Sequence, residues 1–362
     1  MNKVKTNTKS FTEKKIHTQK VDPAAFFSTG RLTFTRAALS FGGPTDFYYN
    51  LGGYTIRLRF AGAALIPLIT PALAHLEQAP VPEPALTVFL WDSRSTHTHM
   101  PSPPWKEEDY REFGLIRGFN NDRIKTVHQS ALHMIDLDRN EAIYWIPDAR
   151  QVPHFHTITP LRTIFHWWLS TRQRYIVHAA AVGIPEAGVL ITGKGGAGKS
   201  TTALSCITAG LQYVGDENCI ITYPPEPYVF SIYSSGTLEP QDVDKIPALK
   251  ASLTNPEKLH EQKAVYQLFR DYQAHISQGF PVKAVFVPKV TGKRETTVTK
   301  RSAAQTLMAL APGSIFQLPG AGKQTLHAMA ALLRSVPCFT LELGTNLSQI
   351  PVVIEYFLRN NM

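Results

Sequence analysis

Eight residues near the middle of the chain, Gly193 to Ser200, have the types and spacing that bind a nucleoside triphosphate. They read Gly-Lys-Gly-Gly-Ala-Gly-Lys-Ser and match G-x-x-x-x-G-K-[ST] at every fixed position. In such a loop the glycines let successive N–H groups converge on phosphate oxygens, the lysine contacts the β- and γ-phosphates, and the final hydroxyl ligates Mg²⁺. We therefore expect ATP and Mg²⁺ as cofactors, with Lys199 at the phosphates and Ser200 at the metal. The residues expected to contact the nucleotide are Gly193, Lys194, Gly195, Gly196, Ala197, Gly198, Lys199, Ser200 and Thr201.

An adjacent pair of acids, Asp216 and Glu217, follows the loop and the helix expected after it. The pair comes directly after Tyr213-Val214-Gly215, which has the composition of a short strand. Two carboxylates at a strand end can divide the work of phosphoryl transfer, because one can accept the proton of an attacking hydroxyl while the other holds the metal or its water. The alternative is a charged pair that caps a turn. The position beside the phosphate loop favours a functional pair.

His178 is the third candidate. It lies at the start of an apolar run, Val177 to Val182, that we interpret as the strand preceding the one that enters the loop. A single histidine on a strand is more often packed and hydrogen-bonded than reactive. The residue alone therefore leaves both roles open.

These features occur in an order that resembles a known family. The stretch from His178 to Ile221 resembles the catalytic core of HPr kinase/phosphorylase. In that core a histidine-containing strand, a run similar to Gly188–Gly193 of this chain, a phosphate loop and paired acids follow one another. The resemblance implies that Asp216 is the catalytic acid/base and that His178 lies near the transferred phosphate. It places Glu217 where a second aspartate is usual, which makes Glu217 a candidate metal ligand beside Ser200.

The wider chain resembles the HPr-kinase-related serine kinases of peptide-modification systems, including those that phosphorylate lasso peptide precursors. This resemblance extends to Leu161–Trp168 and Phe316–Gly320. One departure is Ser234–Glu239, which stands where HPr kinases carry an L-E-I-R-G-like segment, so we do not expect the reverse, dephosphorylating reaction. Glu239 within that segment is either an additional metal ligand or a simple turn carboxylate.

The elements around the loop predict an α/β fold with a mixed sheet. A buried strand is expected before the loop at 187–192, and a helix after it at 200–209, ended by Gly210. A hairpin is expected at 220–222 and 228–230, around Pro224-Pro225. By resemblance this part has the P-loop core that HPr kinase shares with phosphoenolpyruvate carboxykinase. Further helices are expected at 257–276, 302–310 and 325–336.

The first half of the chain predicts an α+β accessory domain. Strands are expected at 54–60 and 86–90, a hairpin at 133–136 and 142–145, and a helix at 162–171 whose Trp167-Trp168 pair packs between domains. We place the domain boundary near residue 175. The expected domains are a disordered basic tail at 1–22, the accessory domain at 23–175 and the catalytic domain at 176–362.

Composition narrows the classes of protein and of binding partner that remain possible. The chain has 362 residues, 43% of them hydrophobic, but its most apolar stretch, 60–76, is short of the roughly 20 residues of a membrane span and contains two prolines. Three scattered cysteines in apolar surroundings suggest buried thiols and a cytoplasmic location. The net charge of +9 suits an acidic partner, yet no nucleic-acid motif accompanies it. We expect neither a membrane nor a nucleic acid as partner, and the sequence does not indicate an oligomeric state.

Together these observations predict an ATP-dependent kinase that transfers the γ-phosphoryl group to a hydroxyl, most simply serine of a peptide or protein. Two alternatives stay open at this stage. One is a kinase with a small-molecule hydroxyl acceptor, and the other is a regulatory protein that binds ATP without phosphorylating anything. A phosphate loop and nearby acids are compatible with all three.

Overall fold

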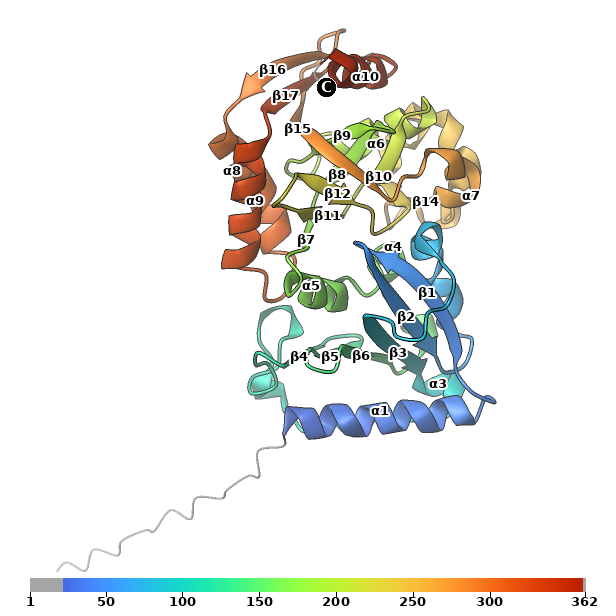
Figure 1. Ribbon diagram of the computed structural model, residues 1–362. Coiled ribbons are helices and arrows are strands. Elements are labelled where there is room, and N and C mark those ends of the chain that lie inside the picture. The colour runs from blue at the N-terminus through green and yellow to red at the C-terminus, as the bar shows by residue number, and fades with distance from the viewer. Residues whose placement is uncertain (1–21, 361–362) are drawn as a thin grey trace, which may run out of the picture.

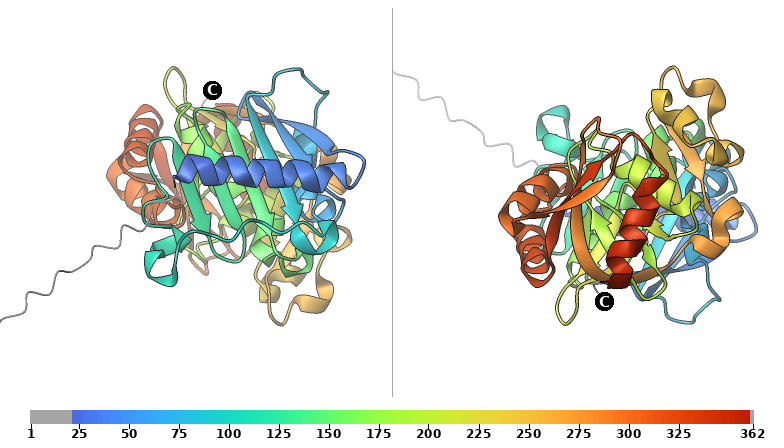
Figure 2. Two further views of the ribbon diagram at one scale, coloured as in Figure 1. Left: turned by 90° about the horizontal axis from the view of Figure 1, so that it is seen from below. Right: turned by 90° about the horizontal axis from the view of Figure 1, so that it is seen from above.

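The computed structural model describes residues 22–360, and the basic tail expected at 1–22 lies, except for Asp22, outside the described residues. Two β-sheets form the body of the molecule, with α4 (His154–Ile158) and α5 (Arg162–Ser170) between them (Figure 1). Helix α1 (Pro23–Leu39) crosses the outer face of the first sheet (Figure 2). The expectation of a mixed α/β protein is confirmed.

The first sheet contains six strands of the described chain in the order β1-β2-β3-β6-β5-β4. Strand β3 runs parallel to β2 and β6, and the other pairs are antiparallel. The strands and short helices of this part are β1 (Thr45–Leu51), β2 (Tyr54–Phe60), α2 (Ile66–Ile69), η1 (Pro71–Leu76), β3 (Leu86–Asp92), α3 (Ser93–Thr96), η2 (Glu107–Asp109), η3 (Glu112–Gly114), β4 (Ile124–His128), β5 (Leu132–Asp136), β6 (Glu141–Ile146) and η4 (Ala149–Gln151).

Local sequence explains the outer layer of this sheet. Asp22 caps α1 by accepting a hydrogen bond from the N–H of Ala24, and Pro23 occupies the first turn, where no donor is needed. The helix buries Phe26, Phe27 and Phe34 against the outer face of the sheet. The opposite face packs toward α5, so this sheet has apolar layers on both sides.

The second sheet contains the order β10-β8-β9-β15-β12-β11-β7, with β17 beside β15 and β16 beside β17. Strand β15 is parallel to β9 and β17, and the other pairs are antiparallel, which makes the sheet mixed as expected. Its strands are β7 (Tyr175–Val177), β8 (Ala180–Ile184), β9 (Ala187–Ile191), β10 (Gln212–Gly215), β11 (Cys219–Thr222), β12 (Tyr228–Phe230), β15 (Gly279–Val290), β16 (Thr297–Arg301) and β17 (Cys338–Leu343).

Helices cover both faces of this second sheet (Figures 1 and 2). Helices α6 and α10 pack on one face, and α8 and α9 on the other. A small sheet of β13 and β14 lies beside α6. The remaining elements are α6 (Lys199–Thr208), β13 (Ser235–Leu238), η5 (Pro240–Lys245), η6 (Pro247–Ser252), η7 (Pro256–Lys258), β14 (Ala264–Gln267), α7 (Phe269–Tyr272), η8 (Gln273–His275), α8 (Ala303–Ile315), α9 (Lys323–Ser335) and α10 (Gln349–Asn360).

One hydrophobic core crosses residue 175, where we placed a domain boundary. Trp168 of α5 lies in the same cluster as Ile176 and Ile220 of the second sheet and Leu58 of the first. Trp167 donates a hydrogen bond from its indole N–H to the carbonyl of Pro319, at 2.8 Å. The tryptophan pair therefore packs between the two sheets, as the sequence predicted.

Two expected elements are wrong. The run 177–182 is not one strand, because β7 pairs with β11, β8 pairs with β9 and β10, and His178 lies in the bend where the chain passes from one pairing to the other. The helix expected at 257–276 is replaced by short helical turns around β14, because Ala264–Gln267 pairs with Ser235–Leu238. In both segments, pairing with a strand that is distant in sequence determines the local backbone conformation.

Two smaller expectations can be checked as well. The three cysteines, Cys206, Cys219 and Cys338, are free and buried, as predicted. Among the helices of residues 22–360, none is long and apolar enough to cross a membrane.

Candidate active site

The phosphate-loop motif forms the connection from β9 to α6. Strand β9 is buried along its whole length, which fixes the start of the loop in the centre of the second sheet. Gly198 has a φ of +101°, and a Cβ there would lie 2.5 Å from Cδ1 of Leu343, so any other residue at this position would be strained. The ammonium of Lys199 donates hydrogen bonds to the carbonyls of Gly193 and Lys194, at 2.8 and 3.2 Å.

A cavity of about 1550 Å³ opens over this loop. All nine predicted nucleotide contacts, residues 193–201, line it, together with His178 and Glu217. Its other walls come from the end of β15, the β17–α10 connection and one face of α8. Asp216 does not line the cavity, since it is only 1% exposed and lies behind the wall.

Thr237 of β13 holds the acid pair in place. Its backbone N–H donates to Oδ2 of Asp216 at 3.0 Å, and its hydroxyl donates to Oε1 of Glu217 at 2.8 Å. The other oxygen of Asp216, Oδ1, is buried and has no hydrogen-bond partner of ordinary length within the described chain. A buried acceptor without a partner is costly unless it is protonated or meets a cation.

The two carboxyl groups have opposite pKa shifts. Burial and the neighbouring Glu217 charge raise the pKa of Asp216 to about 7, although the N–H of Thr237, the Ser200 hydroxyl and Lys199 favour its ionised form. Burial alone would also raise the pKa of Glu217, but His178 and Lys263 outweigh it and lower that pKa. The pair thus combines one acid that can exchange a proton near neutral pH with one that stays ionised.

His178 faces Glu217 from the bend between β7 and β8. Its Nδ1–H donates to the backbone carbonyl of Glu217 at 2.9 Å, and Nδ1 is 3.6 Å from Oε2 of the same residue. Burial and the Lys199 charge lower the pKa of His178, so the ring is neutral at pH 7. Because Nδ1 carries the proton, Nε2 is free to accept a hydrogen bond.

Lys263 contributes to the site although no sequence signal indicated it. It lies just before β14 and lines the cavity, with its ammonium 3.7 Å from Oε1 of Glu217 and 3.2 Å from Oε1 of Glu239. Burial opposes the charged form, but these carboxylates outweigh it and raise the pKa of Lys263. Glu239 is therefore an ion-pair partner of Lys263 at the cavity wall. Thr237 was also missed, although it belongs to the segment 234–239 that the sequence singled out.

The donor set fits a magnesium-bound nucleotide. Ser200 and Glu217 line the cavity, and the Ser200 hydroxyl interacts with the Asp216 carboxyl, so that the oxygen ligands Mg²⁺ prefers are close together. No group of three or more His, Cys, Asp or Glu side chains that could hold a metal by themselves occurs in residues 22–360. Mg²⁺ commonly binds through one or two protein groups together with substrate phosphates.

Comparison with known proteins adds little to this geometry. No protein-family model matches the chain, and no curated protein matches its sequence. Among solved structures, the chain is similar to the Hpr(Ser) kinase/phosphatase from Coxiella burnetii, with 12% sequence identity and a TM-score of 0.28 over 51% of this chain and 94% of that one. Similarity at this level does not bear on activity.

Proposed function

We propose that this protein is an ATP-dependent kinase that transfers the γ-phosphoryl group of ATP to a hydroxyl, namely serine of a peptide or protein. The observation that carries the proposal is the combination of a complete phosphate loop with a neighbouring acid whose pKa is about 7. Nucleotide binding alone does not require a neighbouring acid with a pKa near neutral pH, whereas proton transfer from a hydroxyl does. This feature favours a kinase over a regulatory ATP-binding protein.

In this proposal residues 193–201 bind the phosphates of ATP through backbone N–H groups and the ammonium of Lys199. The N-terminus of α6 adds its partial positive charge. Ser200 and Glu217 would hold Mg²⁺, which would supply positive charge at the phosphates. Lys199 already lies over the loop, where it contacts the carbonyls of Gly193 and Lys194.

The transfer is a displacement at the γ-phosphorus. The acceptor oxygen forms a bond to that phosphorus, the bond to the β–γ bridging oxygen breaks, and ADP leaves with its electrons. The proton of the hydroxyl passes to the acid pair and rests on Asp216, which has the higher pKa of the two. His178 orients the phosphoryl group or the acceptor through Nε2. Most of the catalytic effect in such a site comes from positioning and charge neutralisation.

A peptide acceptor is supported by the walls of the cavity. Basic side chains outnumber acidic ones there, in agreement with the net charge of +9. Helix α8 and the residue after it also contribute two exposed apolar side chains, Met308 at 76% and Phe316 at 69%. A wall with exposed apolar side chains and excess positive charge suits a chain segment better than a small neutral metabolite.

The experiment that tests the function follows labelled phosphate. The protein is incubated with Mg²⁺ and γ-labelled ATP, and separately with a degenerate serine-peptide library and a panel of free hydroxyl metabolites, and the products are resolved by mass. The proposal predicts phosphate on peptide serine. Labelling of free serine or a sugar with unlabelled peptides would replace it with a metabolite kinase, and ATP binding without any labelled acceptor would replace it with a regulatory protein.

A further inference from the structure

Arg162, the first residue of α5, is fixed close to the segment that holds the acid pair. Two buried hydrogen bonds connect the chain just before it to that segment. The Tyr233 hydroxyl donates to the carbonyl of Pro160 at 2.8 Å, and the Ser235 hydroxyl donates to the carbonyl of Ile158 at 2.9 Å. Ser235 begins β13, the strand that carries Thr237. The start of α5 therefore lies beside the strand that positions Asp216 and Glu217.

The guanidinium of Arg162 has no hydrogen bond or ion pair with any side chain or carbonyl of residues 22–360, although the residue is partly buried. Two other arginines have ion-pair partners: Arg59 pairs with Asp46, and Arg123 pairs with Asp136. Arginine does not lose its proton in proteins, so the positive charge of Arg162 remains. Because a buried charge without a partner is costly, this cation is expected to meet an anion in the working protein.

No carboxylate of residues 22–360 forms an ion pair with Arg162. Two of its neighbours are His156 and His166, and burial lowers the pKa of each to about 4, so both are neutral. The Tyr233 hydroxyl is engaged with Pro160. Among the described residues, Glu217 is the one carboxylate whose charge acts on Arg162, and Glu217 is already close to His178 and Lys263.

Arg162 also lies on a particular side of the site. Its charge acts on Glu217 and His178, but it is not among the charges that act on Lys199 or Asp216. Arg162 is therefore closer to Glu217 and His178 than to Lys199 of the phosphate loop. A group bound at Arg162 is on the acceptor side of the transfer, away from the nucleotide.

We propose that Arg162 binds an anionic group of the acceptor, a carboxylate close to the hydroxyl that receives the phosphate. This rests on the proposed kinase function and narrows its substrate class to acidic peptides. A planar guanidinium recognises a carboxylate through two parallel N–H···O bonds, which fixes orientation as well as affinity. Arg162 is then a specificity-determining residue, and its missing partner belongs to the substrate.

The test compares acidic and neutral peptides on two forms of the protein. Fluorescent serine peptides are prepared with Asp and Glu around the serine, with Asn and Gln in their place, and with a free or an amidated C-terminus. Binding in the presence of ADP and Mg²⁺ is measured by anisotropy for wild type and Arg162→Gln. We expect wild type to prefer a carboxylate-bearing peptide by about 10- to 100-fold, the scale of a hydrogen bond to a charged group, and Arg162→Gln to lose that preference.

A control separates recognition from overall charge. Arg36→Ala removes an exposed arginine of α1 far in sequence from the site and should keep the wild-type preference. The free and amidated peptides distinguish a terminal carboxylate from a side-chain carboxylate. Equal binding of acidic and neutral peptides to wild type, or an unchanged preference in Arg162→Gln, would overturn the proposal even if the protein phosphorylates peptides.

Stability gives an independent readout. Because Arg162 is a partly buried charge without a partner, Arg162→Gln should leave the ligand-free protein as stable as wild type or more stable. A purely structural arginine would behave in the opposite way. A lower unfolding midpoint of Arg162→Gln, together with unchanged peptide preference, would identify Arg162 as a packing residue.

Discussion

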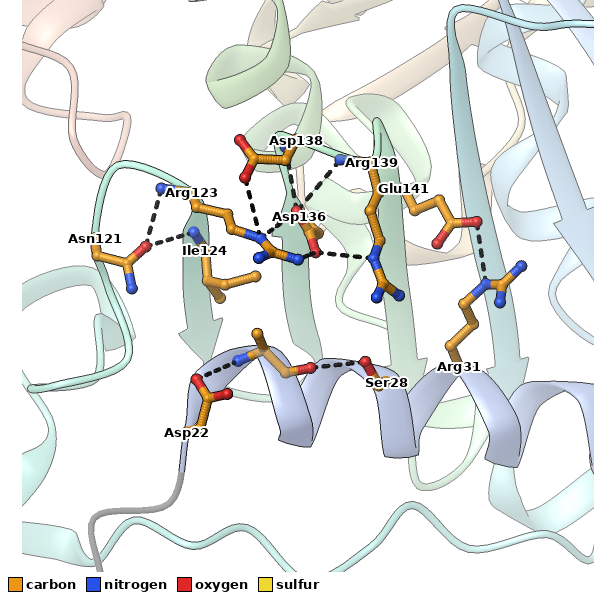
Figure 3. A network of polar contacts seen from close by, with 11 residues as sticks. Asp22, Ser28, Arg31, Asn121, Arg123, Ile124, Asp136, Asp138, Arg139 and Glu141 are labelled. Atoms are coloured by element: carbon orange, nitrogen blue, oxygen red, sulfur yellow. Dashed lines mark hydrogen bonds and ion pairs between the residues drawn. The ribbon is translucent and has the colours of Figure 1, made fainter.

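Asp136 in the first sheet and Asp216 in the second are equally buried, at 1% exposure, yet their pKa values shift in opposite directions. Asp136 accepts two hydrogen bonds from Arg123, at 3.0 and 2.7 Å, and two more from the backbone N–H groups of Asp138 and Arg139 (Figure 3). Burial would raise its pKa, but these donors lower it. Asp216 has one N–H donor of ordinary length, and its pKa rises to about 7.

The difference shows that low solvent exposure alone does not raise the pKa of a carboxyl group. Both carboxylate oxygens of Asp136 accept hydrogen bonds from Arg123, so the residue fixes the end of β5 and stays ionised. Around Asp216 one oxygen is left without a partner, and the carboxyl is able to take up a proton. The same contrast separates Arg123, which is paired, from Arg162, which is not.

The largest expected effect comes from the nucleotide site itself. Lys199→Ala removes the cation at the β- and γ-phosphates, so ATP·Mg²⁺ should no longer stabilise the variant. For wild type, that stabilisation is about 2.7 kcal/mol when ATP is present at about 100 times Kd. Thermal unfolding with and without ATP measures it, and the nucleotide-free midpoints should stay close. Equal ATP-induced shifts in both proteins would contradict the assignment of the loop.

The comparison of the two aspartates predicts opposite effects of the same substitution. At pH 8, Asp136→Asn should lower the free energy of unfolding by about 1.5–3 kcal/mol, because it weakens hydrogen bonds to a charged group. Asp216→Asn should leave it unchanged or raise it, because the variant no longer ionises a buried carboxyl. Urea unfolding of both variants tests this. Destabilisation of both to the same extent would show that the two aspartates are alike.

The pH dependence follows from the same shift. The pKa of Asp216 is about 7 in the folded protein and near 3.8 when exposed, so between these values the folded protein binds one more proton than the unfolded chain. Its contribution to stability is therefore complete below about pH 4 and is lost as the pH rises through 7. Wild type should lose stability over this window relative to Asp216→Asn. A constant difference between the two proteins would contradict the raised pKa.

The smallest effect distinguishes two glycines of the loop. Gly198→Ala combines a left-handed backbone with a Cβ 2.5 Å from Leu343, so it should cost at least the roughly 1–2 kcal/mol of a left-handed residue. Gly195 has an ordinary φ and open space around it, so Gly195→Ala should change stability by less than about 0.5 kcal/mol. Unfolding free energies compare them. Similar losses in both variants would show that the loop backbone differs from the one described.

Sequence predicted the parts of the site that local chemistry determines. The loop, the strand before it and the helix after it follow from a contiguous pattern of glycine, lysine and apolar residues, and Asp216 and Glu217 come at the end of the strand expected for them. Pairing between distant strands was not visible. Because β7 pairs with β11, His178 lies in a bend and not within the expected strand. Because residues 264–267 pair with β13, they form β14 and not part of the expected helix.

The neighbours that tune the site were also not predictable from sequence. Lys263 and Thr237 reach the acid pair because β13 and β14 pair with each other, and neither residue belongs to a recognisable motif. Arg162 lies in a helix that the sequence did predict, but its lack of a partner becomes visible only when all possible partners are placed. The roles of these residues, and of His178, depend on three-dimensional contacts.

The central claim, that Asp216 is the buried acid of a phosphoryl transfer, is tested most directly by single-turnover transfer from γ-labelled ATP to a serine-peptide library. Wild type, Asp216→Asn and Asp136→Asn are compared at pH 7.5, and ATP affinity is measured for each. We expect Asp216→Asn to bind ATP·Mg²⁺ like wild type and to transfer phosphate about 10²–10⁴-fold more slowly, and folded Asp136→Asn to transfer at the wild-type rate. Wild-type transfer by Asp216→Asn would contradict the account.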